Sequence, residues 1–278
     1  MPAQIIDGKN LAASMRQGLR AARERGGSPV QLISIEVGEN PAAAVYIRGQ
    51  KRAAEEVGIK LTTKILPEDI SEEGLLEVLS SLNDDPTVHG VILQRPLPPH
   101  IDPRRVQGTI SRHKDVEGMN PANMGAILYR EPLLPPCTAA AALELIVQTG
   151  VDLRGAETVV VGHSEIVGKP VAVLLLHHLS TVTVCHIGTR NLTEHTRRAD
   201  ILVVAVGKAG LVTGDMIKPG AVVIDIGINL VDGKVVGDVD HKTAAEVAGF
   251  LSPVPGGVGP LTVAMLMRNT LRAAGIDL

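Results

Sequence analysis

A glycine-rich turn between two apolar runs is the first place where residue types and spacing suggest chemistry. Residues 158–161 are β-branched, Gly162 follows them, and a helical pattern begins near Val167. Gly162 permits a sharp turn after a strand, and Gly168 permits close packing of the helix on that strand. Ser164 takes the place of the usual second glycine. Backbone N–H groups at the start of such a helix can face a pyrophosphate, so the turn predicts a dinucleotide site.

The end of the next predicted strand indicates which dinucleotide would bind. An acid at this place usually bonds the ribose hydroxyls of NAD. Here the strand ends at Cys185 and His186, and Arg190 follows before any acid does. A carboxylate would repel a 2′-phosphate and Arg190 would attract it, so we predict NADP. The alternatives, that Arg190 is a surface cation and His186 a strand-end side chain without a ligand, stay open at this point.

Two further predicted strands end in small residues, at Gly207 and Gly227, where a dinucleotide would lie across the sheet. We predict no metal ligands. The predicted cofactor-binding residues are Gly162, His163, Ser164, Ile166, Val167, Gly168, His186, Thr189, Arg190, Gly207 and Ile228.

Composition excludes several classes of function. The chain has 278 residues and a net charge of −3, whereas nucleic-acid binders normally carry a basic excess. Aromatic residues are 1% of the sequence, too few for a protein that recognises bases by stacking. The two cysteines, Cys137 and Cys185, lie far apart and suit neither a disulfide scaffold nor a zinc site. Without a signal-peptide pattern or a membrane-length apolar run, we expect a cytoplasmic protein.

The elements that position these residues alternate along the chain. Apolar runs joined by helical patterns indicate parallel sheets covered by helices on both faces, so the predicted fold class is α/β. Strands are predicted at 31–37, 60–65, 88–94, 158–161, 181–185, 201–206 and 222–226. Helices are predicted near 11–23, 42–57, 72–82, 139–148, 167–177, 192–198 and 262–274.

The pattern divides into two α/β domains. Residues 133–138 have the composition of a hinge, and Thr138 could cap the helix that follows. We predict a first domain over 1–138 and a second, Rossmann-like domain over 139–261. The C-terminal helix, 262–275, is expected to pack back on the first domain.

Eight segments occur in an order that resembles one family, the bifunctional methylenetetrahydrofolate dehydrogenase/methenyltetrahydrofolate cyclohydrolases. The resemblance covers essentially the whole chain. Its most specific part is the last segment, whose density of Pro and Gly suits a rigid loop close to a ligand. The segments are 41–46, 94–98, 114–118, 136–138, 162–170, 225–229, 237–239 and 253–262.

The resemblance implies two domains with a cleft between them, with folate mainly on the first domain and NADP on the second. Members of this family oxidise methylene- to methenyltetrahydrofolate by hydride transfer, and the same site then hydrates the product to formyltetrahydrofolate. They are commonly homodimers paired through the cofactor domain.

The resemblance also implies roles for individual residues. Tyr46 would stack on the substrate, and Gln94 would hydrogen-bond the catalytic side chain at position 50. Glu117 stands for the carboxylate of this family and would accept two parallel N–H bonds from a pterin. The predicted catalytic residues are therefore Gln50, Gln94 and Glu117. The predicted substrate-binding residues are Tyr46, Asp115, Pro255, Gly256 and Gly257.

Position 50 departs from the family pattern, in which a lysine follows the tyrosine by four residues and serves as the general acid/base. Here Gln50 stands at that place. Gly58 confirms the register, because the glycine of the family pattern follows its lysine by eight residues. Lys51 is displaced from Gln50 by about 100° around a helix, so it cannot simply replace the lysine. An amide cannot transfer a proton in the ordinary pH range, whereas hydride transfer depends chiefly on orientation. We therefore expect the cyclohydrolase activity to be reduced more than the dehydrogenase activity.

Other departures keep two alternatives open. Ala43 stands where the family commonly has Ser, Arg95 where it has a small or apolar residue, Glu117 where it has Asp, and His163 where some relatives have Arg. The chain could be a divergent paralog that acts on a different substrate. It could also be a non-catalytic NADP-binding or scaffold protein, although the intact cofactor turn and the segment 253–262 count against that.

Overall fold

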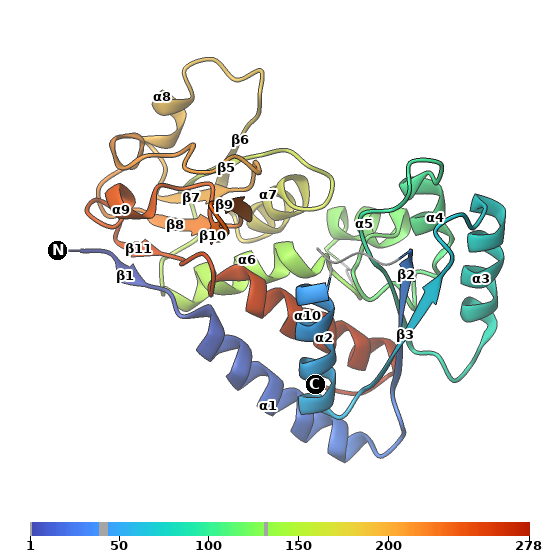
Figure 1. Ribbon diagram of the computed structural model, residues 1–278. Coiled ribbons are helices and arrows are strands. Elements are labelled where there is room, and N and C mark those ends of the chain that lie inside the picture. Colours follow the sequence, from blue (N-terminus) through green and yellow to red (C-terminus); the bar gives the residue numbers. More distant parts are fainter. Residues whose placement is uncertain (1, 39–43, 131–132) are drawn as a thin grey trace. The chain divides into compact units, whose positions relative to one another are not determined.

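The computed structural model describes residues 2–38, 44–130 and 133–278, and the chain forms two compact units (Figure 1). Unit 1 comprises Met1–Ala12 and Thr138–Thr262, and unit 2 comprises Ala13–Cys137 and Val263–Leu278. The predicted boundary differs at the start of the chain, where residues 1–12 belong to unit 1 rather than to the unit that follows them in sequence.

Unit 1 contains a parallel sheet of six strands in the order β1-β11-β8-β7-β5-β6, whose strands are labelled in Figure 1. From β5 the chain passes to β6 on one side and then to β7 on the other, so the strand order reverses between β5 and β7. The strands are β1 Gln4–Ile5, β5 Glu157–Val161, β6 Thr181–Cys185, β7 Ile201–Val204, β8 Val222–Asp225 and β11 Phe250–Leu251.

Helices and one hairpin complete unit 1. The hairpin is antiparallel and consists of β9, Asn229–Val231, and β10, Lys234–Val236. The helices are α6 Cys137–Gln148, α7 Gly168–His177, α8 Leu192–Thr196 and α9 His241–Ala244, with a 3₁₀ turn at Gly214–Met216.

Unit 2 contains a parallel sheet of three strands in the order β3-β2-β4, in which the strand order reverses between β2 and β4. Three helices, α1, α6 and α10, have residues in both units. The strands are β2 Gln31–Val37, β3 Lys60–Leu66 and β4 Gly90–Leu93. The helices are α1 Gly8–Gly26, α2 Ala44–Val57, α3 Glu72–Asp84, α4 Pro103–Thr109, α5 Pro121–Leu128 and α10 Val258–Ala273.

Each unit has an aliphatic core built on its central strands. All four residues of β7 are fully buried, as expected for a parallel strand covered on both faces. In unit 2, Ile33, Ile35 and Val37 of β2 pack with Leu75 and Leu79 of α3. The predicted α/β class is confirmed. No helix in the described part of the chain is long and apolar enough to cross a membrane.

Several predicted boundaries move in the structure. The strands at 31–37 and 181–185 have the predicted limits, but α10 begins at Val258, so part of the predicted loop 253–262 is helical. The helix α6 begins at Cys137, which puts Thr138 inside its first turn and rules it out as the cap. The departure at Ala43 lies outside the described residues.

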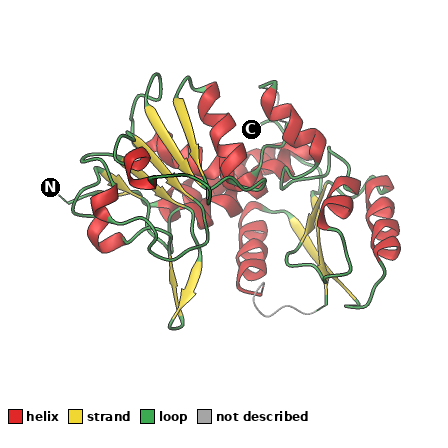
Figure 2. Ribbon diagram, turned by 90° about the horizontal axis from the view of Figure 1, so that it is seen from above, coloured by secondary structure: helices red, strands yellow, loops and turns green. Residues whose placement is uncertain are grey.

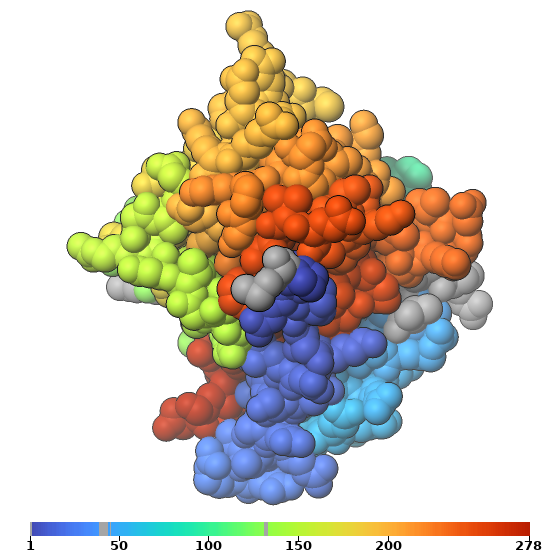
Figure 3. All heavy atoms as spheres, turned by 90° about the vertical axis from the view of Figure 1, so that its left-hand side faces the viewer, coloured from blue at the N-terminus to red at the C-terminus, as the bar shows by residue number. Residues whose placement is uncertain are grey.

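The N-terminal strand was not predicted. β1 pairs in parallel with β11, Gln4 opposite Phe250 and Ile5 opposite Leu251, and Figure 3 shows the dark-blue N-terminal segment against the orange-red surface of this region. Strands this short contain no readable alternation of apolar and polar residues.

Candidate functional site

The turn after β5 requires both of its glycines. Gly162 has φ +125°, and a Cβ there would lie 2.1 Å from the carbonyl oxygen of Ala205. A Cβ at Gly168 would lie 2.1 Å from the carbonyl oxygen of Gly162. The loop after β5 is therefore packed directly against the end of β7, where the strand order reverses. In open α/β sheets, ligands bind at this kind of position.

Ser164 shapes the start of α7. Its Oγ accepts hydrogen bonds from the backbone N–H groups of Val167, at 3.1 Å, and Gly168, at 3.4 Å. These two N–H groups therefore have a partner within the turn itself. Residues 163–166 of the turn are exposed, and they are the part that is open to a ligand.

The loop after β6 folds back on itself beside the turn. The Oγ1 of Thr189 accepts from the backbone N–H of His186 at 2.8 Å, and the N–H of Gly188 donates to Nδ1 of His186 at 3.1 Å. The ring centroids of His163 and His186 are 5.1 Å apart, so the structure brings these two predicted residues together. Arg190 is exposed in the same loop.

Exposed apolar side chains follow four neighbouring strands of unit 1. Ile166 comes after β5, Ile187 after β6, Val206 after β7 and Ile228 after β8. Since these strands are parallel, all four residues lie on the carboxyl side of the sheet. An apolar edge with exposed backbone and cationic side chains fits a dinucleotide, which has flat rings as well as phosphates. Ile187 and Val206 were not predicted, although each stands directly after a strand.

In unit 2, two glutamines and a serine form a buried chain of hydrogen bonds. The Nε2 of Gln94 donates to Oγ of Ser34 at 2.9 Å and to Oε1 of Gln50 at 2.7 Å. Ser34 and Gln50 are fully buried, and Gln94 nearly so. The Nε2 of Gln50 is buried with no acceptor in good hydrogen-bond geometry among the residues that the structure describes, although the Gln50 side chain interacts with the hydroxyl of Tyr46. Such a donor is costly to leave unpaired, so it suits an acceptor on a ligand.

Glu117 follows an isolated bridge that pairs Asp115 with Val91 beside β4. Burial, and then the negative charge of Asp115, raise the pKa of the Glu117 carboxyl to about 7; the guanidinium of Arg95 and the backbone N–H of Leu93 oppose this shift. Glu117 therefore exchanges its proton close to neutral pH, which makes it a candidate functional group.

Asp115 is held by three hydrogen bonds within unit 2. It is fully buried, and its carboxylate accepts from the backbone N–H of Asn120 at 2.6 Å, Nδ2 of Asn123 at 2.9 Å and Nε2 of Gln107 at 3.2 Å. Burial nevertheless raises the pKa of this carboxyl. These donors lie in α4 and at the start of α5, so Asp115 ties the loop that carries Glu117 to both helices.

Tyr46 lies one turn before Gln50 on α2. Its side chain is 39% exposed, yet the surroundings of its hydroxyl group raise the pKa of that hydroxyl, first by excluding water and then through the negative charge of Glu117. Tyr46, Gln50, Gln94 and Glu117 all belong to unit 2.

The remaining predicted substrate-binding residues belong to unit 1 and directly precede α10. Gly256 has φ +115°, and the N–H of Gly257 donates to the carbonyl oxygen of Pro253 at 2.8 Å. A Cβ at Gly8 would lie 2.0 Å from the carbonyl oxygen of Gly257, so α1 begins in direct contact with this segment. Pro255 is exposed beside these two glycines.

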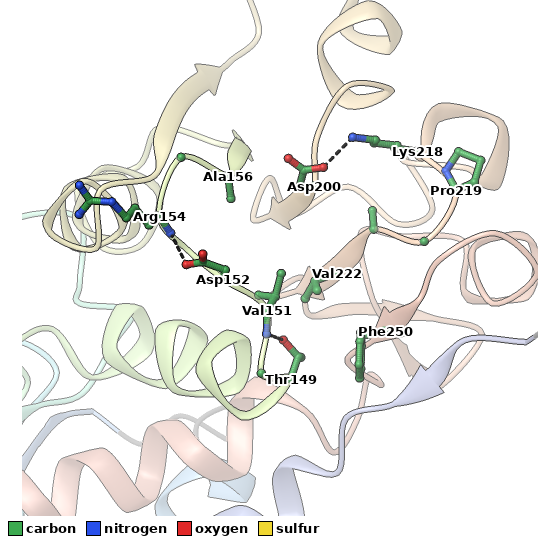
Figure 4. Close-up of a pocket in the computed structure, with 14 residues that line it drawn as sticks. Thr149, Val151, Asp152, Arg154, Ala156, Asp200, Lys218, Pro219, Val222 and Phe250 are labelled. Atoms are coloured by element: carbon green, nitrogen blue, oxygen red, sulfur yellow. Dashed lines mark hydrogen bonds and ion pairs between the residues drawn. The ribbon is translucent and has the colours of Figure 1, made fainter.

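A hollow of about 560 Å³ lies at the opposite, amino-terminal edge of the unit 1 sheet (Figure 4). Asp200 and Lys218 of its lining form an ion pair at 2.6 Å, and the backbone N–H of Arg154 donates to Asp152 at 2.9 Å. None of the predicted site residues lines this hollow, and these polar groups bond one another, so it is not the candidate site.

Comparisons with known proteins agree with this arrangement. The model of the tetrahydrofolate dehydrogenase/cyclohydrolase catalytic domain matches residues 6–117, and that of the NAD(P)-binding domain of the same enzymes matches residues 136–277. The chain belongs to the tetrahydrofolate dehydrogenase/cyclohydrolase family. The family predicted from the sequence is thereby confirmed, and with it the class of enzyme.

Individual members of the family are similar over nearly their whole length. The bifunctional protein FolD of Rhodobacter capsulatus is 52% identical over 97% of this chain and 93% of its own. The crystal structure of the bifunctional enzyme FolD from Campylobacter jejuni has a TM-score of 0.94 at 39% identity, covering 99% of this chain and 100% of that one. The Trypanosoma brucei enzyme, solved with NADP and an inhibitor, has a TM-score of 0.92 at 37% identity, covering 98% and 97%.

Proposed function

We propose that this protein is an NADP-dependent methylenetetrahydrofolate dehydrogenase whose cyclohydrolase activity is weak. The observation that carries the proposal is the buried Gln50 amide, hydrogen-bonded by Gln94, at the position where the sequence resemblance expects a lysine. Family membership supports the substrate, and the open turn and apolar edge of unit 1 support a dinucleotide.

The dehydrogenase reaction needs orientation more than proton transfer. NADP, when bound, supplies an acceptor for the hydride that leaves the methylene carbon. Tyr46 offers an aromatic face for the folate, and Glu117, as a carboxylate, can accept two N–H bonds from the pterin. The unpaired Nε2 of Gln50 can donate to a substrate acceptor. None of these tasks requires an ionisable group at position 50.

Hydration and ring opening need a group that gives and takes a proton. The amide of Gln50 cannot do so near neutral pH. Lys51 is exposed, on a different side of α2 from the fully buried Gln50. Arg95 is exposed too, and one of its guanidinium nitrogens lies 3.5 Å from the carbonyl oxygen of Pro103. Neither cation occupies the place of the missing lysine.

The preference for NADP over NAD rests on the loop after β6. Arg190 is exposed there, and no acid stands between β6 and Arg190. The paired rings of His163 and His186 add two polar side chains beside the turn. These groups can surround a 2′-phosphate, whereas the carboxylate typical of NAD-specific sites is missing from this loop.

We also propose that the protein is a cytoplasmic homodimer paired through unit 1. The β9–β10 hairpin projects from this unit (Figure 2), and it exposes Leu230, Val231 and Val235. Exposed apolar side chains gathered on one element are typical of a protein interface. Both cysteines are free and buried, which suits a reducing compartment.

The test is an assay with methylenetetrahydrofolate and NADP that follows NADPH and the methenyl product separately. We expect NADPH to form while methenyl product accumulates. Gln50→Lys should restore hydration, and Lys51→Gln, which removes the neighbouring exposed lysine, should change neither step. Hydration by the unmodified protein well above the spontaneous rate would contradict the proposal, as would the absence of NADPH formation.

A further inference from the structure

We infer that Asp238 is a positioning residue that holds the loops after β7 and β8 in the shape that receives the dinucleotide. The inference rests on the proposed function, because it assumes that these loops, with Gly207 and Ile228, bind NADP. It concerns Asp225 and Asp238, two carboxylates of the segments 225–229 and 237–239 that have no part in the proposed reaction.

The carboxylate of Asp238 is fully buried and accepts four hydrogen bonds from neutral donors. Its Oδ2 accepts from the backbone N–H groups of Val206, at 2.6 Å, and Gly207, at 2.9 Å. Its Oδ1 accepts from the N–H of Lys208 and from Nδ2 of Asn229, both at 2.9 Å. Three consecutive N–H groups of the loop after β7 thus converge on one side chain, which also bonds Asn229 at the start of β9, where the loop after β8 ends.

A second buried carboxylate fixes the backbone around Asp238. Oδ1 of Asp225, at the end of β8, accepts from the N–H groups of Gly227 at 2.9 Å and Asp238 at 3.0 Å. Its Oδ2 accepts from the N–H of Val239 at 3.0 Å and lies 3.4 Å from Nε2 of His241. Asp225 therefore holds the loop after β8 and the segment of Asp238 in one register.

The two glycines of these segments are required by the two carboxylates. A Cβ at Gly227 would lie 2.2 Å from Cγ of Asp238, and a Cβ at Gly237 would lie 1.8 Å from Oδ2 of Asp225. Any side chain at either position would displace a carboxylate from its donors. The two glycines thus leave room for the carboxylates of Asp225 and Asp238, and these carboxylates hold the loops after β7 and β8.

The place of these loops gives the network its function. β7 adjoins β5, where the strand order reverses, and β8 is the next strand along. Ligands of open α/β sheets lie across the carboxyl ends of such strands. Asp238 cannot touch a ligand, because it is buried. It acts through the backbone of residues 206–208, whose N–H groups would otherwise turn outward or bond water.

The experiment measures NADP binding by calorimetry, together with amide hydrogen exchange of residues 206–208. Asp238→Asn keeps the shape of the side chain but turns an NH₂ group toward N–H donors. We expect at least a tenfold rise in the Kd for NADP and faster exchange at 206–208. The matched control is Asp240→Asn, which also removes a carboxylate that accepts two N–H bonds, but in the cap of α9. Its Kd for NADP should stay within twofold of the parent.

The outcomes separate the inference from the proposed function. A folded Asp238→Asn protein with the parent's Kd, or with unchanged exchange at 206–208, overturns the inference. If that variant does not fold, Asn229→Ala removes one of the four bonds and should raise the Kd two- to fivefold; an unchanged Kd overturns the inference equally. If the unmodified protein itself does not bind NADP, the proposed function fails, whatever the exchange data show.

Discussion

At the scale of single residues, Glu117 differs in burial from the nearby carboxyl of Asp115. It is only partly buried, unlike Asp115, and its pKa is raised to about 7. A carboxyl whose pKa is raised by folding binds its proton more tightly in the folded state. It therefore adds stability below its unfolded pKa, near 4.5, and this contribution is lost as the pH rises through about 7.

The first prediction follows from the direction of this pKa shift. The free energy of unfolding of Glu117→Gln, relative to the parent, should rise between roughly pH 5 and pH 8, because the amide is never ionised. Urea unfolding at both pH values measures the difference. Glu77→Gln, an exposed change on α3 of the same unit, is the control, and its difference should be the same at both values. If the stability of Glu117→Gln relative to the parent changes with pH no more than that of Glu77→Gln, the raised pKa of Glu117 is contradicted.

Arg190 gives a second prediction at this scale. Arg190→Ala should weaken NADP binding roughly tenfold, which corresponds to about 1.4 kcal/mol, and should leave NAD binding within twofold of the parent. The reason is that only NADP carries a 2′-phosphate for the guanidinium to bind. Titration with both cofactors tests this. Equal losses for NADP and NAD would show that Arg190 does not read the 2′-phosphate.

At the scale of elements, strands were predictable where β-branched and other apolar residues recur between turn residues. β2 and β6 have their predicted limits because each is a complete run between turn residues. β1 and β11 pair only because tertiary contacts bring them together, so the local sequence does not contain that information. Likewise, Gln50 and Gln94 were predicted from the resemblance, whereas Ser34 is one polar residue in an apolar strand, and only the fold places it beside Gln94.

The third prediction concerns the turn between β5 and α7. Gly162→Ala should lower the free energy of unfolding by about 3 kcal/mol or more, because it adds a strained φ to a clash with the backbone of Ala205. It should also abolish NADP binding. The control is Gly155→Ala, which has φ +75° but open space around the new Cβ, and should cost about 1 kcal/mol. Chemical denaturation compares the two, and similar losses would contradict the close approach of the turn to β7.

At the scale of the whole molecule, each unit has its candidate residues where the strand order of its sheet reverses. The turn of Gly162 lies between β5 and β7 of unit 1, and Ser34 and Gln94 lie on or after β2 and β4 of unit 2. The broad division into two α/β units could be predicted from the alternation of patterns. The assignment of residues 1–12 to unit 1 could not, because it depends on a pairing between the two ends of the chain.

The fourth prediction tests that pairing. Deleting residues 2–5 removes β1 and leaves β11 as an unpaired edge of the sheet. We expect a lower unfolding midpoint and concentration-dependent aggregation, because open edges template pairing with other chains. Circular dichroism during heating measures the midpoint, and light scattering measures the aggregation. Changing Gln4 to Lys instead keeps the backbone pairing and should leave the midpoint almost unchanged. A truncated protein that melts and scatters like the parent would show that β1 contributes little.

The pairing of β1 with β11 also sets an order of events during synthesis. Residues 4 and 5 leave the ribosome before their partners at 250 and 251 have been made, so the edge place in the sheet must be filled late. Unit 2, by contrast, has its whole sheet within residues 31–93 and can begin to fold much earlier. A nascent chain stalled anywhere before Phe250 therefore carries an incomplete sheet and a waiting N-terminal segment, which makes that stage of translation the one at which chaperones have most to protect.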